Sequence, residues 1–417
     1  MVAALGTAQT LAWASSYYLP AMLARPMARD LGVQVTTVFA AFSLAMLLAA
    51  AVGPFAGRAI DRLGGRPVLV GSNLMFAAGL GGLAMAQGPW GLFAAWLLIG
   101  VGMGSGLYEA GFASLVRLYG RDARDAITGI TLIAGFASTV GWPLSAALEI
   151  GIGWRGACGV WAALHLVLGL PLNLSLPRIN AGQGPTMASA SAPASAPAPA
   201  RSTPGGTPHP AAAPGAWDAA EPLAHPLRAA VLLSFVFATT WFVSTAMASH
   251  LPTLLQAGGV SLAAAVAAGA LIGPAQVAGR LLEFGLLRRL HPLLSARAAA
   301  LGHPVGAVLL LFFGAPVAMV FAVMHGLGNG IMTIAKGTLP LAIFGPHGYG
   351  ALQGLLMAPT RIAQAAAPLV FGWCLDRWGL QSLWLSAGLC ALAFVALMAL
   401  PFVSGTRGGG ERPQPAA

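Results

Sequence analysis

Apolar residues run along the chain in stretches of about 20, the length that an α-helix needs to cross a ~30 Å hydrocarbon core. Six such stretches precede residue 177 and six follow residue 227. They lie near residues 3–24, 36–57, 67–87, 91–116, 126–148, 155–176, 228–250, 261–284, 297–314, 316–343, 351–374 and 380–402. The pattern predicts an all-α polytopic membrane protein with twelve transmembrane helices.

The composition agrees with this pattern and argues against a soluble domain, a disulfide-rich protein and a metal-binding protein. Of the 417 residues, 57% are apolar and 8% are charged, whereas a soluble domain carries about a quarter charged residues. The three cysteines, Cys158, Cys374 and Cys390, all lie inside apolar stretches, so we expect neither a disulfide framework nor a metal site. The sequence contains no phosphate-binding motif, and we expect no cofactor.

The arginines are distributed unevenly between the two sides of the predicted bundle. With the N-terminus inside, fifteen collect on the inner side and four on the outer side. The inner set is Arg58, Arg62, Arg66, Arg117, Arg121, Arg124, Arg178, Arg201, Arg228, Arg280, Arg288, Arg289, Arg297, Arg407 and Arg412. The outer set is Arg25, Arg29, Arg155 and Arg377. The positive-inside rule then places both termini in the cytoplasm. It also accounts for the net charge of +10 without a nucleic-acid partner.

Residues 177–226 interrupt the apolar pattern. They contain eleven prolines among Ala, Ser and Gly and lack the periodicity that would bury a core. We interpret them as a disordered cytoplasmic linker between an N-terminal six-helix bundle, residues 1–176, and a C-terminal one, residues 227–403. A regulatory binding role for the linker stays open. Residues 404–417 are expected to form a disordered cytoplasmic tail.

The two predicted bundles repeat each other's features. Gly57-Arg58 ends the second span and Gly279-Arg280 ends the eighth. The fourth and tenth spans each carry three glycines at alternate positions. These are Gly102, Gly104 and Gly106 in the fourth span and Gly326, Gly328 and Gly330 in the tenth. Two pseudo-symmetric six-helix halves are the layout of a transporter whose binding site lies between the halves.

The loop after the second span reads GRAIDRLGGRPVL. It resembles the loop motif of the major facilitator superfamily (MFS), of the form G-x-x-x-D-R-x-G-R-[RK]. Its matching positions are Gly57, Asp61, Arg62, Gly64 and Arg66, while Gly65 replaces the first of the two final basic residues. Asp61 can meet a neighbouring helix N-terminus or one of the two nearby arginines. The resemblance implies that this contact locks the outward-facing state.

Two further segments, Gly153–Arg155 and Gly372–Gly379, resemble bacterial members related to the monocarboxylate-transporter branch. The resemblance implies a multi-pass protein of the bacterial cytoplasmic (inner) membrane, expected to be monomeric. It also implies that the first, fourth, seventh and tenth helices line the transport pathway.

Few ionisable residues fall inside the spans, and a charge at the bilayer centre costs at least ~2.5 kcal/mol. Glu109 and Lys336 occupy corresponding positions in the fourth and tenth spans, so the resemblance implies that they face each other. Three roles stay open: a cytoplasmic gate, a proton carrier at Glu109, or a static pair. Arg361, in the eleventh span with Gln364 one turn on, needs a carboxylate from the protein or from a substrate.

Polar side chains follow one face of the tenth helix, because His325, Asn329 and Lys336 are spaced at helical intervals. We expect this face to line the pathway, with Tyr17 of the first span and Trp241 of the seventh contributing to a substrate site.

These observations favour a secondary active, proton-coupled transporter of a small molecule over a nucleotide-driven pump or an enzyme. The surplus of cations in the C-terminal half favours a small organic anion or oxyanion as the substrate. Proton-driven efflux of a neutral metalloid such as arsenite, or of a hydrophobic drug, is the alternative. A membrane-embedded enzyme would need clustered His, Asp or Cys, which the sequence lacks. A non-transporting sensor is the remaining option.

Overall fold

A computed structural model describes residues 1–178, 225–287 and 290–401. The linker and tail predicted from the sequence therefore lie almost entirely outside the described residues. Every element in the described part is helical. Eight continuous helical segments there are long and apolar enough to cross a membrane, and the segments Pro89–Leu174 and Tyr349–Met398 each contain more than one crossing.

The N-terminal half consists of α1 (Val2–Ser15), α2 (Leu19–Asp30), α3 (Val35–Leu63), α4 (Gly65–Met85), α5 (Pro89–Gly106), α6 (Tyr108–Tyr119), α7 (Ala123–Ala134), α8 (Ala137–Leu164) and α9 (Leu170–Leu174). A turn of π-helix, His165–Gly169, joins α8 to α9. The chain reverses direction within α8 at Gly153, whose φ of 73° is available at little cost only to glycine. Nine helices thus make six crossings. The first, fourth and fifth crossings are α1 with α2, α5 with α6, and α7 with α8 as far as Gly153, and the sixth is the rest of α8 continued by α9.

The C-terminal half consists of α10 (Pro226–Ala257), α11 (Leu262–Gly285), α12 (Pro292–Phe313), α13 (Ala318–Phe344), α14 (Tyr349–Trp378) and α15 (Leu383–Met398). Each of these helices makes one crossing. Together the described residues confirm the expected all-helical fold of two six-helix halves.

The breaks inside three N-terminal spans differ from the uninterrupted runs that the sequence predicts. The first span breaks after Ser15 and continues to Asp30, six residues beyond its expected end at 24. The fourth breaks at Leu107 and the fifth near Gly135. Apolar length does not show these breaks, because a run of about 20 mostly apolar residues predicts a span whether or not its helix is continuous.

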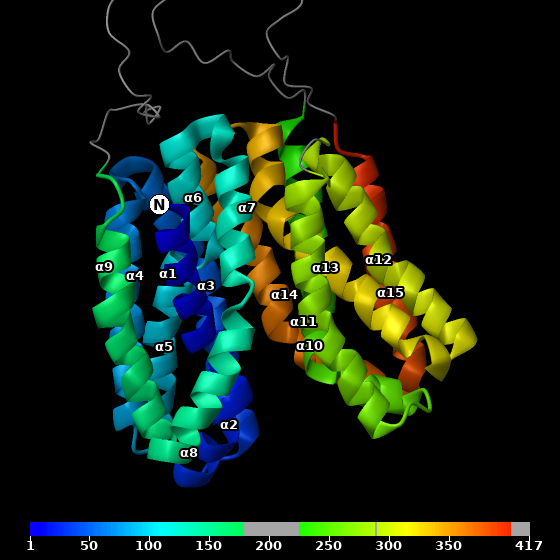
Figure 1. The fold of residues 1–417 in the computed structure, drawn as a ribbon, viewed down its shortest axis with the longest axis horizontal. Coiled ribbons are helices and arrows are strands. Elements are labelled where there is room, and N and C mark those ends of the chain that lie inside the picture. The colour runs from blue at the N-terminus through cyan, green and yellow to red at the C-terminus, as the bar shows by residue number, and fades with distance from the viewer. Residues whose placement is uncertain (179–224, 288–289, 402–417) are drawn as a thin grey trace, which may run out of the picture.

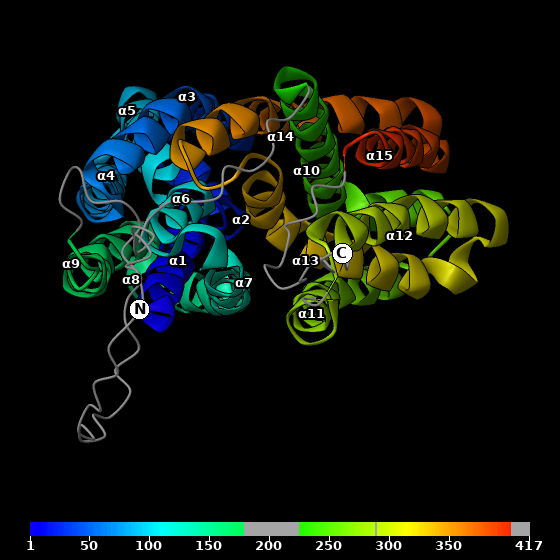
Figure 2. The same cartoon turned by 90° about the horizontal axis from the view of Figure 1, so that it is seen from above.

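We call the end of the molecule at which α1 begins and α9 ends the terminal face, and the other end the opposite face. In Figure 1 the terminal face is at the top, and the two halves lie close together there and further apart at the opposite face. Figure 2 shows α14 at the boundary between the halves, where it packs against both α3 and α10. The boundary between α3 and α14 therefore positions the candidate site.

Each half has its own apolar core. Large apolar side chains also cover the outer surface, for example Trp90 at 87% exposed, Leu369 at 79% and Phe312 at 73%. A surface of this kind is stable in hydrocarbon and not in water.

Candidate functional site

A buried ion cluster of Glu109, Lys336 and Arg361 joins the two halves. Lys336 Nζ on α13 lies 2.7 Å from Glu109 Oε1 on α6, and Arg361 Nη2 on α14 lies 3.0 Å from Glu109 Oε2. The side chains are 1%, 12% and 5% exposed for Lys336, Glu109 and Arg361 respectively. Both carboxylate oxygens are thus held by cations from the other half.

The break in the fourth span places Glu109 in the first turn of α6. The N-terminus of a helix favours a carboxylate, because its first N–H groups and its dipole are positive. Gln9 of α1 donates a 2.7 Å hydrogen bond from Nε2 to the carbonyl oxygen of Gly106, which the break leaves without a helical partner. The break therefore turns an apolar span into a site that can hold a charged side chain.

Aromatic rings surround the cations of the ion cluster. Lys336 Nζ lies 4.7 Å from the ring centroid of Trp241 and 5.8 Å from that of Tyr108. The guanidinium carbon of Arg361 lies 5.7 Å from the ring centroid of Trp13. Ring faces at these distances attract cations. They stabilise the two positive charges without neutralising them.

The ion cluster carries one negative and two positive groups, so its formal charge is +1. It also lies deep in the bundle. Ten residues separate Glu109 from the end of α6, which corresponds to about 15 Å along the helix axis. A surplus positive charge at that depth is costly, and charges retained inside a membrane protein mark functional sites.

Arg280 adds a second guanidinium that the sequence did not reveal. The sequence places it at the inner end of the eighth span, and the structure adds that the residue is buried, at 6% exposed on α11. Its Nε and Nη1 are buried and find no hydrogen-bond partner among the described residues. The side chain packs on the break of the fifth span, where a Cβ added to Gly135 would lie 3.2 Å from Arg280 Cζ. The side chain of a residue in this position leans toward the N-terminus of its own helix and so toward the middle of the bundle. A third buried cation therefore faces the N-terminal half.

The other predicted site residues fall into two groups. Gln364 lies 3.4 Å from Arg361, and Trp241 covers Lys336, so both belong to the ion cluster. The hydroxyl of Tyr17, at the break of the first span, lies 3.5 Å from that of Thr245 across the boundary.

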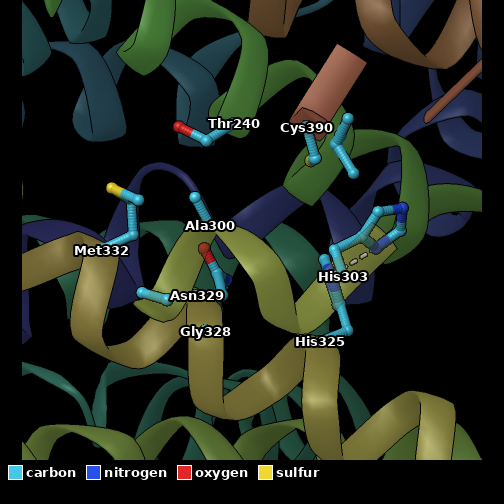
Figure 3. A pocket seen from close by; sticks show the side chains of 10 residues that line it. Thr240, Ala300, His303, His325, Gly328, Asn329, Met332 and Cys390 are labelled. Atoms are coloured by element: carbon cyan, nitrogen blue, oxygen red, sulfur yellow. Dashed lines mark hydrogen bonds between the residues drawn. The ribbon is translucent and has the colours of Figure 1, made fainter. Parts of the chain in front are cut away.

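His325 and Asn329 lie away from the ion cluster, although they share α13 with Lys336. They line a cavity inside the C-terminal half, together with Thr240, His303, Met332 and Cys390 (Figure 3). The residues that the spacing predicts on one polar face of α13 therefore belong to two separate sites, the ion cluster and the cavity inside the C-terminal half.

Neither of the two best-formed cavities in the described structure can hold a substrate. The cavity of Figure 3 has a volume of about 30 Å³, and one between α3 and α14, lined by Glu109 and Arg361, about 10 Å³. A single water needs about 10–15 Å³. The boundary is closed around the ion cluster in this conformation.

Asp61 closes the terminal face. Its carboxylate accepts hydrogen bonds from the backbone N–H groups of Gly350, at 2.9 Å, and Ala351, at 2.8 Å. These residues begin α14, so the carboxylate caps a helix N-terminus of the other half. Of the two partners that the sequence allowed, the helix N-terminus is the one observed.

The remaining motif residues shape the turn around Asp61. Gly57 packs directly on Gly350, where a side chain would overlap the carbonyl. Gly64 has a φ of 82° between α3 and α4. Arg66 Nη1 donates to the carbonyl oxygen of Leu176 at 3.4 Å, and Arg62 is exposed.

A second contact between the halves lies on the same face. Arg124 Nη2 on α7 donates to Glu283 Oε1 on α11 at 3.0 Å, and its Nη1 donates to the carbonyl oxygen of Leu290 at 2.9 Å. Glu283 is buried, with a side chain 3% exposed. Hydrogen bonds between the halves in the described residues thus extend from the terminal face to the level of Tyr17.

The described residues contain no group of three or more His, Cys, Asp or Glu side chains that could hold a metal ion. The three cysteines are buried and unpaired with one another.

Two six-helix halves that meet at a buried ion cluster, with polar contacts on one face, define a secondary transporter. The chain belongs to the Major Facilitator Superfamily, whose family model matches residues 5–318. It is therefore a multi-pass membrane transporter and not an enzyme.

The chain is also similar to individual proteins. The chain is 26% identical over 399 residues to an uncharacterized 38 kDa protein in the 23S RNA operon of Thermoproteus tenax, covering 94% of this chain and 92% of that protein. It is 31% identical over 138 residues to multidrug resistance protein MdtH of Cronobacter sakazakii, covering 33% of this chain and 34% of MdtH. Among solved structures, the E. coli fucose:proton symporter FucP (N162A) superimposes with a TM-score of 0.70 at 14% identity, covering 95% of this chain and 97% of FucP. At that identity the superposition shows the shared fold alone.

Proposed function

We propose that this transporter moves a small organic anion or oxyanion in symport with protons by alternating access. The single observation that carries the proposal is the formal charge of +1 on the ion cluster, where Glu109 balances only one of two buried cations. A substrate anion would supply the missing negative charge. Arg361 offers the planar fork that fits a carboxylate or oxyanion with two hydrogen bonds.

Arg280 supports the same substrate class. Its two buried N–H-bearing nitrogens lack partners in the described structure, and unpaired buried donors are costly. An anion entering the boundary between the halves could accept hydrogen bonds from them.

We further propose that the terminal face lies in the cytoplasm of a bacterial cell, in its cytoplasmic membrane, and that the protein works as a monomer. The inner arginines support this orientation. The conformation described here is then outward-facing, since Asp61 and Arg124 close the cytoplasmic side. In this state Glu109 balances one of the two cations and leaves the other positive charge for the substrate anion.

The substitution Arg361→Lys tests the proposal. Purified protein in liposomes would be assayed for binding and exchange of labelled lactate and succinate. Because Lys keeps the charge and loses the fork, affinity should fall by at least about tenfold, equivalent to 1.4 kcal/mol. Arg58→Lys is the matched control, because Arg58 is exposed and should leave affinity unchanged. A folded Arg361→Lys protein with unaltered affinity for the anion would exclude the anion proposal.

Efflux of a hydrophobic drug is a second candidate, favoured by the partial similarity to a multidrug resistance protein. The same liposomes loaded with a hydrophobic dye would distinguish the two. Proton-driven dye export that Arg361→Lys leaves intact, with no anion transport, would support drug efflux.

A further inference from the structure

Two buried histidines on neighbouring helices contact each other inside the C-terminal half. Nδ1 of His303 on α12 lies 3.0 Å from Nδ1 of His325 on α13. Nε2 of His303 lies 3.0 Å from Ser386 Oγ on α15. Both histidines are 5% exposed. We call His303 and His325 the histidine pair.

The hydrogen bond that Ser386 donates to its own helix gives the bonds of the pair a direction. Ser386 Oγ lies 3.1 Å from the carbonyl oxygen of Leu383, which can only accept, so the hydroxyl donates its proton there. The hydroxyl oxygen therefore accepts from Nε2–H of His303. A neutral imidazole has one N–H, so Nδ1 of His303 is an acceptor and Nδ1–H of His325 is the donor.

This direction leaves Nε2 of His325 with an unused lone pair. His325 lines the cavity of about 30 Å³, which has room for about two waters. Figure 3 shows the two imidazoles at one end of the cavity and Thr240 and Met332 at the other. A proton that arrives through water in the cavity can bind this nitrogen without breaking any hydrogen bond of the pair.

The surroundings of the pair contain few other ionisable groups. Cys390 on α15 is the titratable side chain that shares the cavity, and α10 contributes Thr240 and Val243. Lys336, the nearest charged residue along α13, is eleven residues and about 16 Å from His325. On α11, which also packs against α13, the charged residues are Arg280 and Glu283 near the terminal face. The charge on the pair therefore depends mainly on hydration of the cavity.

Glu109 and His165, two other buried ionisable residues, are less able to take up a proton. Both oxygens of Glu109 are held by cations. His165 in the N-terminal half has both ring nitrogens engaged, with Ser15 Oγ at 2.7 Å and Asn73 Oδ1 at 2.8 Å. Of these three residues, His325 is the one that combines an unengaged ring nitrogen with a place in the lining of a polar cavity.

We propose that the histidine pair is the proton-binding site of this transporter and takes one proton at Nε2 of His325. An N–H bond forms there as an O–H bond of a hydronium ion breaks and leaves water, and the shared Nδ1–H···Nδ1 bond spreads the charge over both rings. This inference rests on the proposed proton-coupled function. The proton charge then offsets the charge of a transported anion.

The first experiment needs no substrate. Protein with ¹⁵N-labelled histidine rings would be studied by NMR between about pH 4 and pH 8, with resonances assigned through His303→Gln and His325→Gln. The neutral tautomers should be Nε2–H for His303 and Nδ1–H for His325, and both rings should shift together as one proton binds. A neutral Nε2–H tautomer for His325, or two rings that titrate independently, would overturn the proposal.

The second experiment measures coupling in liposomes that contain a pH-sensitive dye, with a gradient of labelled lactate or succinate. His325→Gln should retain anion exchange and lose the accompanying proton movement. His303→Asn should give the same loss and serves as a second variant if His325→Gln does not fold. His165→Gln, the matched buried control, should keep the coupling.

Coupling that survives in folded His325→Gln and disappears in Glu109→Gln would overturn the proposal in favour of Glu109. If the native protein moves neither anion, the anion proposal fails, and the tautomers then decide the histidine proposal separately.

Discussion

Glu109 and Lys336 form a 2.7 Å ion pair across the boundary between the two halves, although 227 positions separate them in the chain. Glu109 follows Gly106 by three positions and Lys336 follows Gly330 by six, so the repeat places the two residues within about one helical turn of each other in depth. The internal repeat of the fold is therefore what brings the two charges together.

We expect the two partners to differ in the cost of removing their charge. Glu109→Gln leaves Lys336 and Arg361 without a carboxylate and should lower the free energy of unfolding by about 3–5 kcal/mol, as for other broken buried pairs. Lys336→Gln leaves Glu109 paired with Arg361 and should lower the free energy of unfolding by less. The double variant Glu109→Gln with Lys336→Gln should have a free energy of unfolding between those of the two single variants. Thermal unfolding in detergent measures all three. Glu109→Gln with native stability would show that the cluster does not need its carboxylate.

Much of this arrangement follows from the sequence, and the reasons are local. Apolar length predicts the spans because a membrane requires about 20 apolar residues in a helix. The repeat predicts that Glu109 and Lys336 meet, and the motif names a helix N-terminus among the partners of Asp61. Each of these inferences depends on residue spacing within one helix or on the symmetry between halves.

Other features depend on packing that spacing does not encode. Arg280 lies near the end of its span and looks like a loop arginine, yet its side chain reaches back into the bundle and is buried. His303 is one polar residue in an apolar span, and only the side-by-side placement of α12 and α13 gives it His325 as a partner. The break at Leu107 arises where glycines let neighbouring helices approach, as at Gly106, where an added Cβ would lie 2.6 Å from Ser72 Cβ.

Asp61→Asn should shift the protein toward the state that is open at the terminal face. The amide keeps an acceptor but loses the charge that favours the N-terminus of α14, an effect of about 0.3–2 kcal/mol. A cysteine introduced at Ala358, which lines the small cavity between α3 and α14, should react faster with a maleimide. Asp122→Asn is the control, because Asp122 is exposed near the same face. Unchanged reactivity in Asp61→Asn would argue against a conformational role.

Arg124 and Glu283 should stabilise the same conformation together. The two residues belong to different halves, and Glu283 is buried, so the pair can form only when the terminal face is closed. A double-mutant cycle with Arg124→Gln and Glu283→Gln, read by maleimide labelling at the same introduced cysteine, should give a coupling free energy of about 0.5–3 kcal/mol. Strictly additive effects would mean that the ion pair makes no contribution to closure.

Close approach of α3 and α14 should depend on the absence of a side chain at Gly354. A Cβ there would lie 2.5 Å from the carbonyl oxygen of Gly53 and 2.7 Å from Pro54 Cα. Both are backbone atoms of the other half, so they cannot move aside as a side chain would. Gly354→Ala should force the helices apart and favour the state open at the terminal face.

Gly388→Ala is the matched control for this substitution, because Gly388 lies in a helix of the same half with nothing within 4 Å of an added Cβ. It should keep or raise stability, since Ala favours a helix over Gly by about 1 kcal/mol.

Spin labels at Arg58 and His347, two exposed positions on either side of the boundary at the terminal face, should move apart in Gly354→Ala and stay in place in Gly388→Ala. Equal distances in both variants would mean that the boundary tolerates a methyl group, and the close contact of α3 with α14 would then not control closure.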